Sequence, residues 1–217
     1  MDSSPPPHDG IIFDMDGVLF DSEVLHVRAW IEVGPRHGLE LDPDWIRGWI
    51  GRPDSDLVEH LRAIHGNSID AVFADKAARF TELTRSELRP FPGVIERVEG
   101  LRRGRLPLAI CTSTSAVEAR RMLEATGLAP LFGILVSADD TRRHKPHPEP
   151  YLEAARRLGL DPSACAVIED SPPGVESAVA AGCKVIAVST NFPADRLAGA
   201  GRVFPATTEA IDWLTGI

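Results

Sequence analysis

Acidic residues follow two short apolar runs of this chain, and together they could bind a metal ion. Asp14 and Asp16 come after GIIF, and Glu169 and Asp170 come after CAVI. If both runs are strands of one parallel sheet, their carboxyl ends meet at one edge. Four carboxylates at one place repel one another unless a cation lies among them. Because all-oxygen ligation favours Mg²⁺ over zinc or copper, we predict a magnesium site formed by these four residues.

The spacing of Asp14 and Asp16 suits two separate chemical roles. Residues i and i+2 of an extended segment point to the same side, while Met15 turns the other way into the core. Asp14 could attack phosphorus to form an aspartyl-phosphate, and Asp16 could protonate the leaving alcohol and then take a proton from water. Acid–Gly turns are common in loops, so this motif alone is a weak signal.

Three further residues could bind a phosphate. Thr112 and Ser113 lie between an apolar run and a predicted helix, where free N–H groups and the helix dipole favour an anion. Lys145 follows another apolar run and could neutralise the phosphoryl oxygens and the nucleophile. We interpret Thr112 and Lys145 as catalytic, together with Asp14 and Asp16, and Ser113 as phosphate-binding. Taken singly, each motif is equally compatible with helix capping or a solvated turn.

The elements that must position these residues alternate along the chain. Apolar runs predict strands at 10–13, 106–111, 133–136, 165–168 and 184–188 and near Val203. Helical patterns lie between them at about 94–103, 116–126, 148–158 and 173–181, with a terminal helix from about Thr208. Repeated βα units predict an α/β fold: a Rossmann-like parallel sheet in a three-layer α/β/α core.

One long stretch interrupts this alternation. From Asp21 to about Leu88 the sequence shows only helical patterns, at 22–37 (with a possible break at Gly34-Pro35), 43–50, 55–65 and 69–88. We therefore expect a helical cap over 21–88, inserted after the first strand. The catalytic core would comprise 10–20 and 89–217, and 1–9 would form a flexible N-terminal tail.

Composition and charge exclude some classes of function. The 217 residues are 43% hydrophobic and 25% charged, as in ordinary globular proteins. The net charge of -9 argues against nonspecific nucleic-acid binding, which needs a basic face. No apolar run approaches the ~20 residues of a membrane span, and the start of the chain does not resemble a signal peptide. We expect a cytoplasmic monomer whose partner is a small phosphorylated metabolite, with no nucleic-acid or membrane partner.

Taken in order, the motifs resemble the haloacid dehalogenase superfamily, in the branch that contains β-phosphoglucomutase and related sugar-phosphate phosphatases. The similar segments are Asp14-Met15-Asp16-Gly17-Val18, Thr112-Ser113, Lys145-Pro146-His147-Pro148 and Val167-Ile168-Glu169-Asp170-Ser171. The resemblance extends over nearly the whole chain. It implies Mg²⁺ held by Asp14, the Asp16 backbone carbonyl and Asp170, with Glu169 assisting. It also implies phosphoryl chemistry, because the dehalogenases of the superfamily lack the second aspartate and need no metal.

The cap should decide between phosphatase and mutase. His26 resembles part of the mutase's first cap helix, and Gly51 and Arg52 fall in a segment similar to its substrate-specificity loop, so we predict that these three residues bind substrate. In the mutase, that loop carries an arginine for a second phosphate, and here Asp54 falls where the arginine would align. Arg52 could substitute, but an acid beside a phosphate is repulsive. We therefore favour a phosphatase, with a phosphosugar mutase as the alternative.

A different class also stays open. A response-regulator receiver domain combines a phospho-accepting Asp, an acidic pair, a hydroxyl and a lysine around Mg²⁺, and would be a signalling switch rather than an enzyme. Its acidic pair follows the first strand and its phospho-acceptor a middle strand, in a much shorter chain without a cap. The order in this chain is reversed.

Overall fold

The computed structural model of the protein describes residues 5–49 and 54–216 and contains one parallel sheet. Its strands are β1 (Gly10–Phe13), β2 (Leu108–Cys111), β3 (Ile134–Val136), β4 (Cys165–Glu169), β5 (Lys184–Val188) and β6 (Arg202–Phe204). They lie in the order β3-β2-β1-β4-β5-β6, and every neighbouring pair is parallel. The predicted α/β fold class is confirmed.

The strand order reverses beside β1. From β1 the chain adds β2 and β3 on one side, then returns to place β4, β5 and β6 on the other. Open parallel sheets bind ligands where the order reverses, beyond the carboxyl ends of the strands. Asp14 directly follows β1 and Glu169 ends the neighbouring β4, so the fold places both residues at this crevice.

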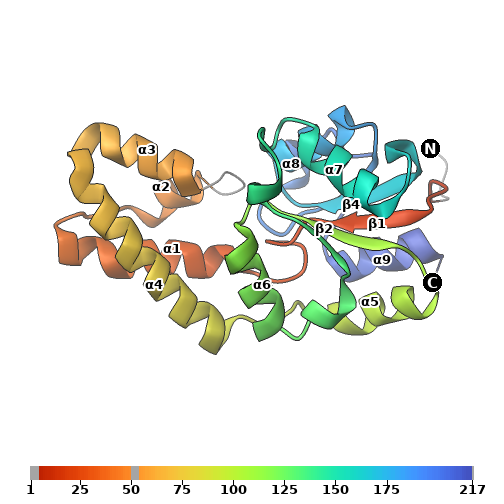
Figure 1. The fold of residues 1–217 in the computed structure, drawn as a ribbon, viewed down its shortest axis with the longest axis horizontal. Helices are drawn as coiled ribbons and strands as arrows, with labels where there is room; N and C mark the ends of the chain where they lie inside the picture. Colours follow the sequence, from red (N-terminus) through yellow and green to blue (C-terminus); the bar gives the residue numbers. More distant parts are fainter. Residues whose placement is uncertain (1–4, 50–53, 217) are drawn as a thin grey trace.

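Helices cover both faces of the sheet. Figure 1 shows α7 (Glu149–Leu158) and α8 (Pro172–Ala180) on one face, and α5 (Val94–Arg103) and α9 (Thr207–Thr215) on the other. The alternation of side chains along a strand serves both layers. In β1, Ile11 and Phe13 pack into one apolar cluster with α5, α9 and α6 (Ala116–Ala125), while Ile12 packs into a second with α7 and α8. The result is a three-layer core.

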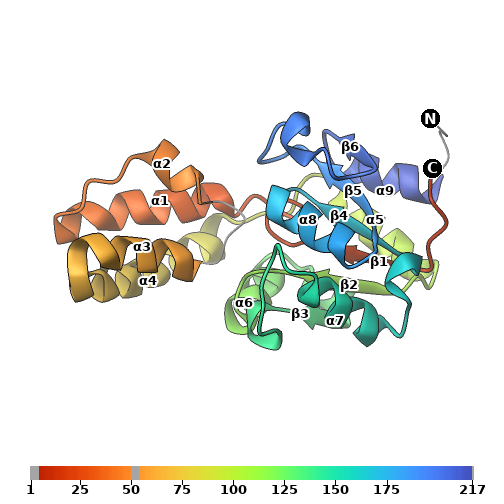
Figure 2. The same ribbon diagram turned by 90° about the horizontal axis from the view of Figure 1, so that it is seen from above.

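Four helices between β1 and β2 form a separate body beside the sheet. They are α1 (Glu23–Val33), α2 (Pro43–Arg47), α3 (Asp54–His65) and α4 (Ile69–Glu87), and Figures 1 and 2 place them beyond one end of the sheet, next to α6. We call this body the cap. It has an apolar cluster of its own: Val27, Trp30, Val33, Leu39, Ile46, Leu57, Val58, Leu61, Ile69 and Val72. The cap is thus a helical unit with its own small core.

Two cap helices end earlier than predicted. A 3-10 turn over Gly34–His37 replaces the end of the first, at the anticipated break, because Pro35 cannot continue the α-helical hydrogen bonds. The second ends at Arg47, and Ile50 lies outside the described residues. The substrate-binding predictions for Gly51 and Arg52 also lie outside the described residues.

The two connections between cap and core run side by side. Phe20 and Pro90 form an antiparallel bridge, and the Phe91 N–H donates to the Leu19 carbonyl at 2.9 Å. These bonds fix where the cap meets the core.

Part of the predicted tail is bonded to the core. The Asp9 N–H donates to the Ala164 carbonyl at 2.8 Å, and Lys184 Nζ donates to the Pro7 carbonyl. Tail residues 1–4 lie outside the described residues. Among the helices in the described part of the chain, none has the length and apolar character that a membrane crossing needs.

Candidate active site

A buried lysine joins the two strand ends at the crevice. Lys145 Nζ donates to Asp14 Oδ1 at 2.6 Å, to Glu169 Oε1 at 2.7 Å and to the Cys111 carbonyl at 3.1 Å. Burial alone would lower the pKa of Lys145, but the two carboxylates outweigh that effect and raise it, so the ammonium stays charged. Arg142 and Arg143, which precede Lys145 in the same basic segment, are exposed.

Glu169 is fully enclosed and accepts five hydrogen bonds. Oε1 accepts from Lys145 and, at 2.9 Å, from Tyr151 Oη, while Oε2 accepts from the Asp170 N–H and from the N–H and hydroxyl of Ser171. Burial raises the pKa of Glu169, but Lys145 and these donors lower it by more, so the residue is ionised. Both carboxylate oxygens of Glu169 already accept hydrogen bonds, which suits a residue that positions Lys145.

Asp170 follows β4 and is bonded to the segment after β5. Its Oδ2 accepts from Asn191 Nδ2 at 2.7 Å and from Thr190 Oγ1 at 3.3 Å. Gly17 lies very close, since a Cβ at this position would be 2.0 Å from Asp170 Oδ2, and its φ of +75° also favours glycine. Burial, followed by the charges of Glu169 and Asp14, raises the pKa of Asp170 well above its usual value.

The carboxylates fit a hard cation. One oxygen each of Asp14, Glu169 and Asp170 lies within 4.8 Å of the others, and all three side chains are buried. Burial raises the pKa of Asp14 to about 8, and the charges of Glu169 and Asp16 add to the shift although Lys145 opposes it, so a further cation beside Asp14 would favour its carboxylate form. Oxygen-only donors suit Mg²⁺. Since Glu169 is already saturated with donors, Asp14 and Asp170 have the better placed oxygens.

Asp16 lies apart from that cluster and accepts bonds from three hydroxyls. Ser22 Oγ donates to Oδ1, and Thr112 Oγ1 and Thr114 Oγ1 donate to Oδ2 at 3.2 and 3.0 Å. Burial raises the pKa of Asp16 above its usual value, although these hydroxyls oppose the shift. The carboxyl group is therefore held in place and can retain a proton.

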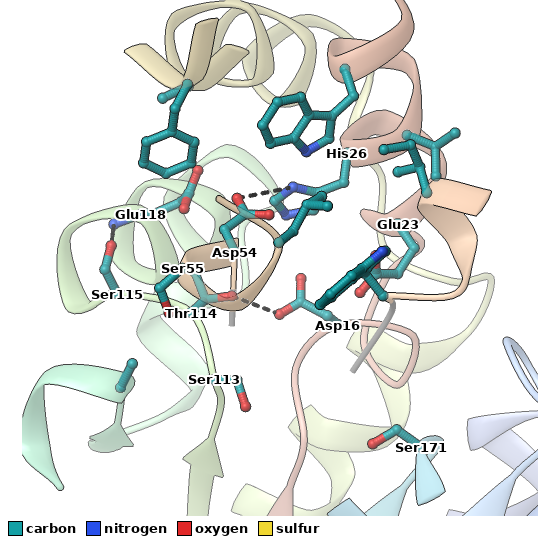
Figure 3. Close-up of a pocket in the computed structure, with 18 of the residues that line it drawn as sticks. Asp16, Glu23, His26, Asp54, Ser55, Ser113, Thr114, Ser115, Glu118 and Ser171 are labelled. Atoms are coloured by element: carbon teal, nitrogen blue, oxygen red, sulfur yellow. Dashed lines mark hydrogen bonds and ion pairs between the residues drawn. The ribbon is translucent and has the colours of Figure 1, made fainter. Parts of the chain in front are cut away.

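A cavity of about 500 Å³ lies between the core and the cap. Asp14, Asp16, Lys145 and Asp170 line its core end, and Ser113 also faces it (Figure 3). Thr112 does not line the cavity, because its hydroxyl is turned to Asp16. Of the two predicted hydroxyl residues, Ser113 therefore lines the cavity, whereas Thr112 is bonded to Asp16.

The cap end of the cavity holds His26 beside Asp54, as Figure 3 shows. Asp54 Oδ2 accepts from Lys76 Nζ at 2.6 Å, and Lys76 also donates to His26 Nδ1 at 2.7 Å. Asp54 is therefore not an isolated acid but half of an ion pair with a lysine from another helix.

Several of these residues were not predicted. Tyr151, Asn191 and Lys76 reach the site from distant segments, and nothing in their local sequence marks them. Thr114 offered a signal, since it is two residues beyond Thr112 in the same turn. Ser22 offered a weaker one, as a hydroxyl directly before a predicted helix.

Comparison with known proteins agrees with this geometry. A family model described as haloacid dehalogenase-like hydrolase matches residues 11–188, and the chain belongs to that family. It is 40% identical to hexitol phosphatase A of Escherichia coli (strain K12), over 86% of this chain and 84% of that protein. It is 33% identical to validoxylamine A 7'-phosphate phosphatase of Streptomyces hygroscopicus subsp. limoneus, over 91% and 93%.

The structure also resembles a solved one. CbbY of Rhodobacter sphaeroides, in complex with xylulose-(1,5)bisphosphate, matches with a TM-score of 0.82 and 25% identity. The match covers 93% of this chain and 96% of that chain. The predicted resemblance to this hydrolase family is confirmed, and the receiver-domain alternative is excluded.

Proposed function

We propose that the protein is a Mg²⁺-dependent phosphatase that hydrolyses a small phosphorylated sugar or polyol through an aspartyl-phosphate on Asp14. The main observation is the buried arrangement of Asp14, Lys145 and Asp170 at the core end of a cavity, with Asp16 next to it. The relatives named above act on phosphate esters, which supports the same reaction here. Its place of action would be the cytoplasm and its form a monomer.

In the first half of the reaction, an oxygen of Asp14 attacks phosphorus and the bond from phosphorus to the ester oxygen breaks. Among the described residues, no donor bonds Asp14 Oδ2, so this oxygen is free to attack while Lys145 holds Oδ1. Asp16 gives its proton to the departing alcohol. Its raised pKa supports this role, because the shift favours the protonated form that a general acid needs.

In the second half, Asp16 has become a carboxylate and takes a proton from water. That water attacks phosphorus, the bond to Asp14 breaks, and inorganic phosphate leaves. Asp14, Asp170 and the Asp16 carbonyl would hold Mg²⁺, which supplies positive charge to the phosphoryl oxygens. Lys145 and Ser113 would orient the phosphate.

Asp54 supports a phosphatase over a mutase. A mutase of this family must also bind a second phosphate at the cap, and Asp54 presents a carboxylate to the cavity there. Lys76 lowers the pKa of Asp54 although burial opposes the shift, so this carboxylate is ionised. A dianionic phosphate beside it would be repelled.

The test is phosphate release from a panel of phosphorylated sugars and polyols, with Mg²⁺ and with EDTA, for wild type and Asp14→Asn. We expect metal-dependent release by wild type and its loss in the variant, whose melting temperature should remain close to that of wild type. Isomerisation of a hexose phosphate without release would show a mutase. Full activity in Asp14→Asn would overturn the assignment of Asp14 as the nucleophile.

A further inference from the structure

The cap end of the cavity is lined by acidic and aromatic side chains. Away from the catalytic centre, the described lining residues include Glu23, Asp54 and Glu118, against a single basic one, Arg121. Trp30, Trp49 and Phe73 add aromatic surface. Figure 3 shows Asp54 next to His26 and across the cavity from Asp16. A substrate whose phosphate lies at Asp14 would extend its other end towards Asp54.

The positive partner of Asp54 is hidden from this cavity. Lys76 has 1% of its surface exposed, does not line the cavity, and lies over the rings of Phe80 and Trp30 at 5.1 and 5.6 Å. The Asp54 side chain, in contrast, is 33% exposed. Only Oδ2 is bonded to Lys76, and among the described residues no donor reaches Oδ1. A ligand therefore meets the carboxylate and not the ammonium.

Lys76 also determines which ring nitrogen of His26 can donate a hydrogen bond. A lysine ammonium can only donate, so His26 Nδ1 must accept and the ring proton lies on Nε2. Burial, together with the charge of Lys76, lowers the pKa of His26 to about 3, which keeps the ring neutral. His26 Nδ1 and Asp54 Oδ2 are 3.8 Å apart. The cap thus holds an acceptor and a donor side by side.

This pair matches hydroxyl groups and not a second phosphate. A hydroxyl can donate to Asp54 Oδ1, and a neighbouring hydroxyl can accept from His26 Nε2. A phosphate dianion has no proton to donate and carries the same charge as Asp54. Aromatic surface beside such polar groups suits the apolar C–H face of a polyol or sugar.

We propose that Asp54, held by Lys76, is the specificity-determining residue of the cap, and that it selects polyhydroxylated monophosphates over sugar bisphosphates. The proposal rests on the phosphatase activity proposed above and names its class of substrate. Asp54 accepts a hydrogen bond from a hydroxyl remote from the phosphate and takes no part in phosphoryl transfer.

The experiment compares three substrates: sorbitol 6-phosphate, glucose 1,6-bisphosphate, and phenyl phosphate, which has no hydroxyl. Wild type and Asp54→Asn are assayed with Mg²⁺. In the variant we expect kcat/KM for sorbitol 6-phosphate to fall about 10-fold or more relative to phenyl phosphate, mainly through KM, because a charged hydrogen bond is lost. In the same variant, kcat/KM for glucose 1,6-bisphosphate should rise relative to kcat/KM for sorbitol 6-phosphate.

Two further variants control for structural damage. Asp56→Asn makes the same change at an exposed position of the same helix. It should leave kcat/KM for sorbitol 6-phosphate unchanged relative to phenyl phosphate and relative to glucose 1,6-bisphosphate. Lys76→Met with Asp54→Asn removes both charges of the buried pair, so it leaves no unpaired ammonium, and should repeat the change in ratios.

The proposal would be overturned if Asp54→Asn left the ratio of kcat/KM for sorbitol 6-phosphate to that for phenyl phosphate unchanged. If both values fell equally, the role of Asp54 would be purely structural. Failure of the proposed function would look different, since wild type would then release phosphate from none of the three substrates.

Discussion

The acidic residues of the site have different environments, and these separate their roles. Asp14 is bonded to a lysine, whereas the side-chain donors to Asp16 in the described part of the chain are three hydroxyl groups. Lys145 favours the carboxylate form of Asp14, whereas burial raises the pKa of Asp16 although its hydroxyl donors oppose the shift. The proposed nucleophile and the proposed acid thus differ in their neighbours from other segments, although they are only two residues apart.

At this scale, Asp16→Asn should slow turnover of a sugar phosphate by roughly 10²- to 10⁴-fold, because the alkoxide leaves without a proton and water is not activated. Nitrophenyl phosphate has a leaving group that needs no proton. With this substrate we expect the variant to show a rapid first release of nitrophenol, about equal to the enzyme present, followed by slow turnover. Stopped-flow absorbance would measure it. An equally slow first turnover with both substrates would remove Asp16 from the acid role.

At the scale of elements, the junction of β4 and α8 determines where Lys145 lies. Ser171 caps α8 through the Gly174 N–H, and the first turn of the helix then closes over Glu169. A Cβ at Gly174 would lie 1.7 Å from Glu169 Oε1. Glu169 cannot turn away without losing hydrogen bonds, so this helix start requires glycine.

Gly174→Ala should therefore destabilise the protein by about 1 to 3 kcal/mol through overpacking and lower phosphatase activity by displacing Glu169 and Lys145. Gly100→Ala is the matched control, at an exposed position of α5 where the nearest atom is 3.8 Å away. It should leave activity unchanged and raise stability by up to about 1 kcal/mol, since alanine favours helix. Urea unfolding and phosphate release would measure both variants. Equal changes in stability and activity in the two variants would contradict the requirement for glycine at position 174.

At the scale of the whole molecule, the proposed metal site lies between the two halves of the sheet, and its clustered carboxylates should lower the stability of the protein when no cation is bound. Asp14 directly follows β1, while Glu169 ends β4 and Asp170 lies in the turn after it. Lys145 is the only cation bonded to them among the described residues. Folding must bring these like charges together, at a cost that a bound cation offsets.

Asp170→Asn should consequently raise the melting temperature without Mg²⁺ by about 2 to 4 °C, if relief of repulsion is worth about 1 kcal/mol. Wild type should gain stability as Mg²⁺ is added, because binding to the folded state stabilises it, and the variant should gain much less. Calorimetry with Mg²⁺ and with EDTA would measure both effects. Asp56→Asn, an exposed acid, should behave as wild type. A variant less stable than wild type in EDTA would contradict the repulsion argument.

The sequence by itself determined the fold and the core of the site. Alternating apolar runs and helical patterns are local signals, and parallel strands all end at the same edge of their sheet. Residues that directly follow the runs, such as Asp14, Ser113 and Asp170, must therefore lie near one another, whatever the details of packing. Their positions in the turns after the strands could be predicted because the end of each apolar run marks the end of a strand.

Only the tertiary structure decided the roles that depend on side chains from distant segments. Thr112 faces Asp16 and not the cavity, and Glu169 is saturated by Tyr151 and by its own turn. At the cap, the sequence showed Asp54 as an acid that would repel phosphate, but not that Lys76 would pair with it. The apolar periodicity of a helix gives the face it buries, but not the rotation and depth at which two helices meet. The contacts among Asp54, Lys76 and His26, which come from three helices, therefore exist only in the folded cap.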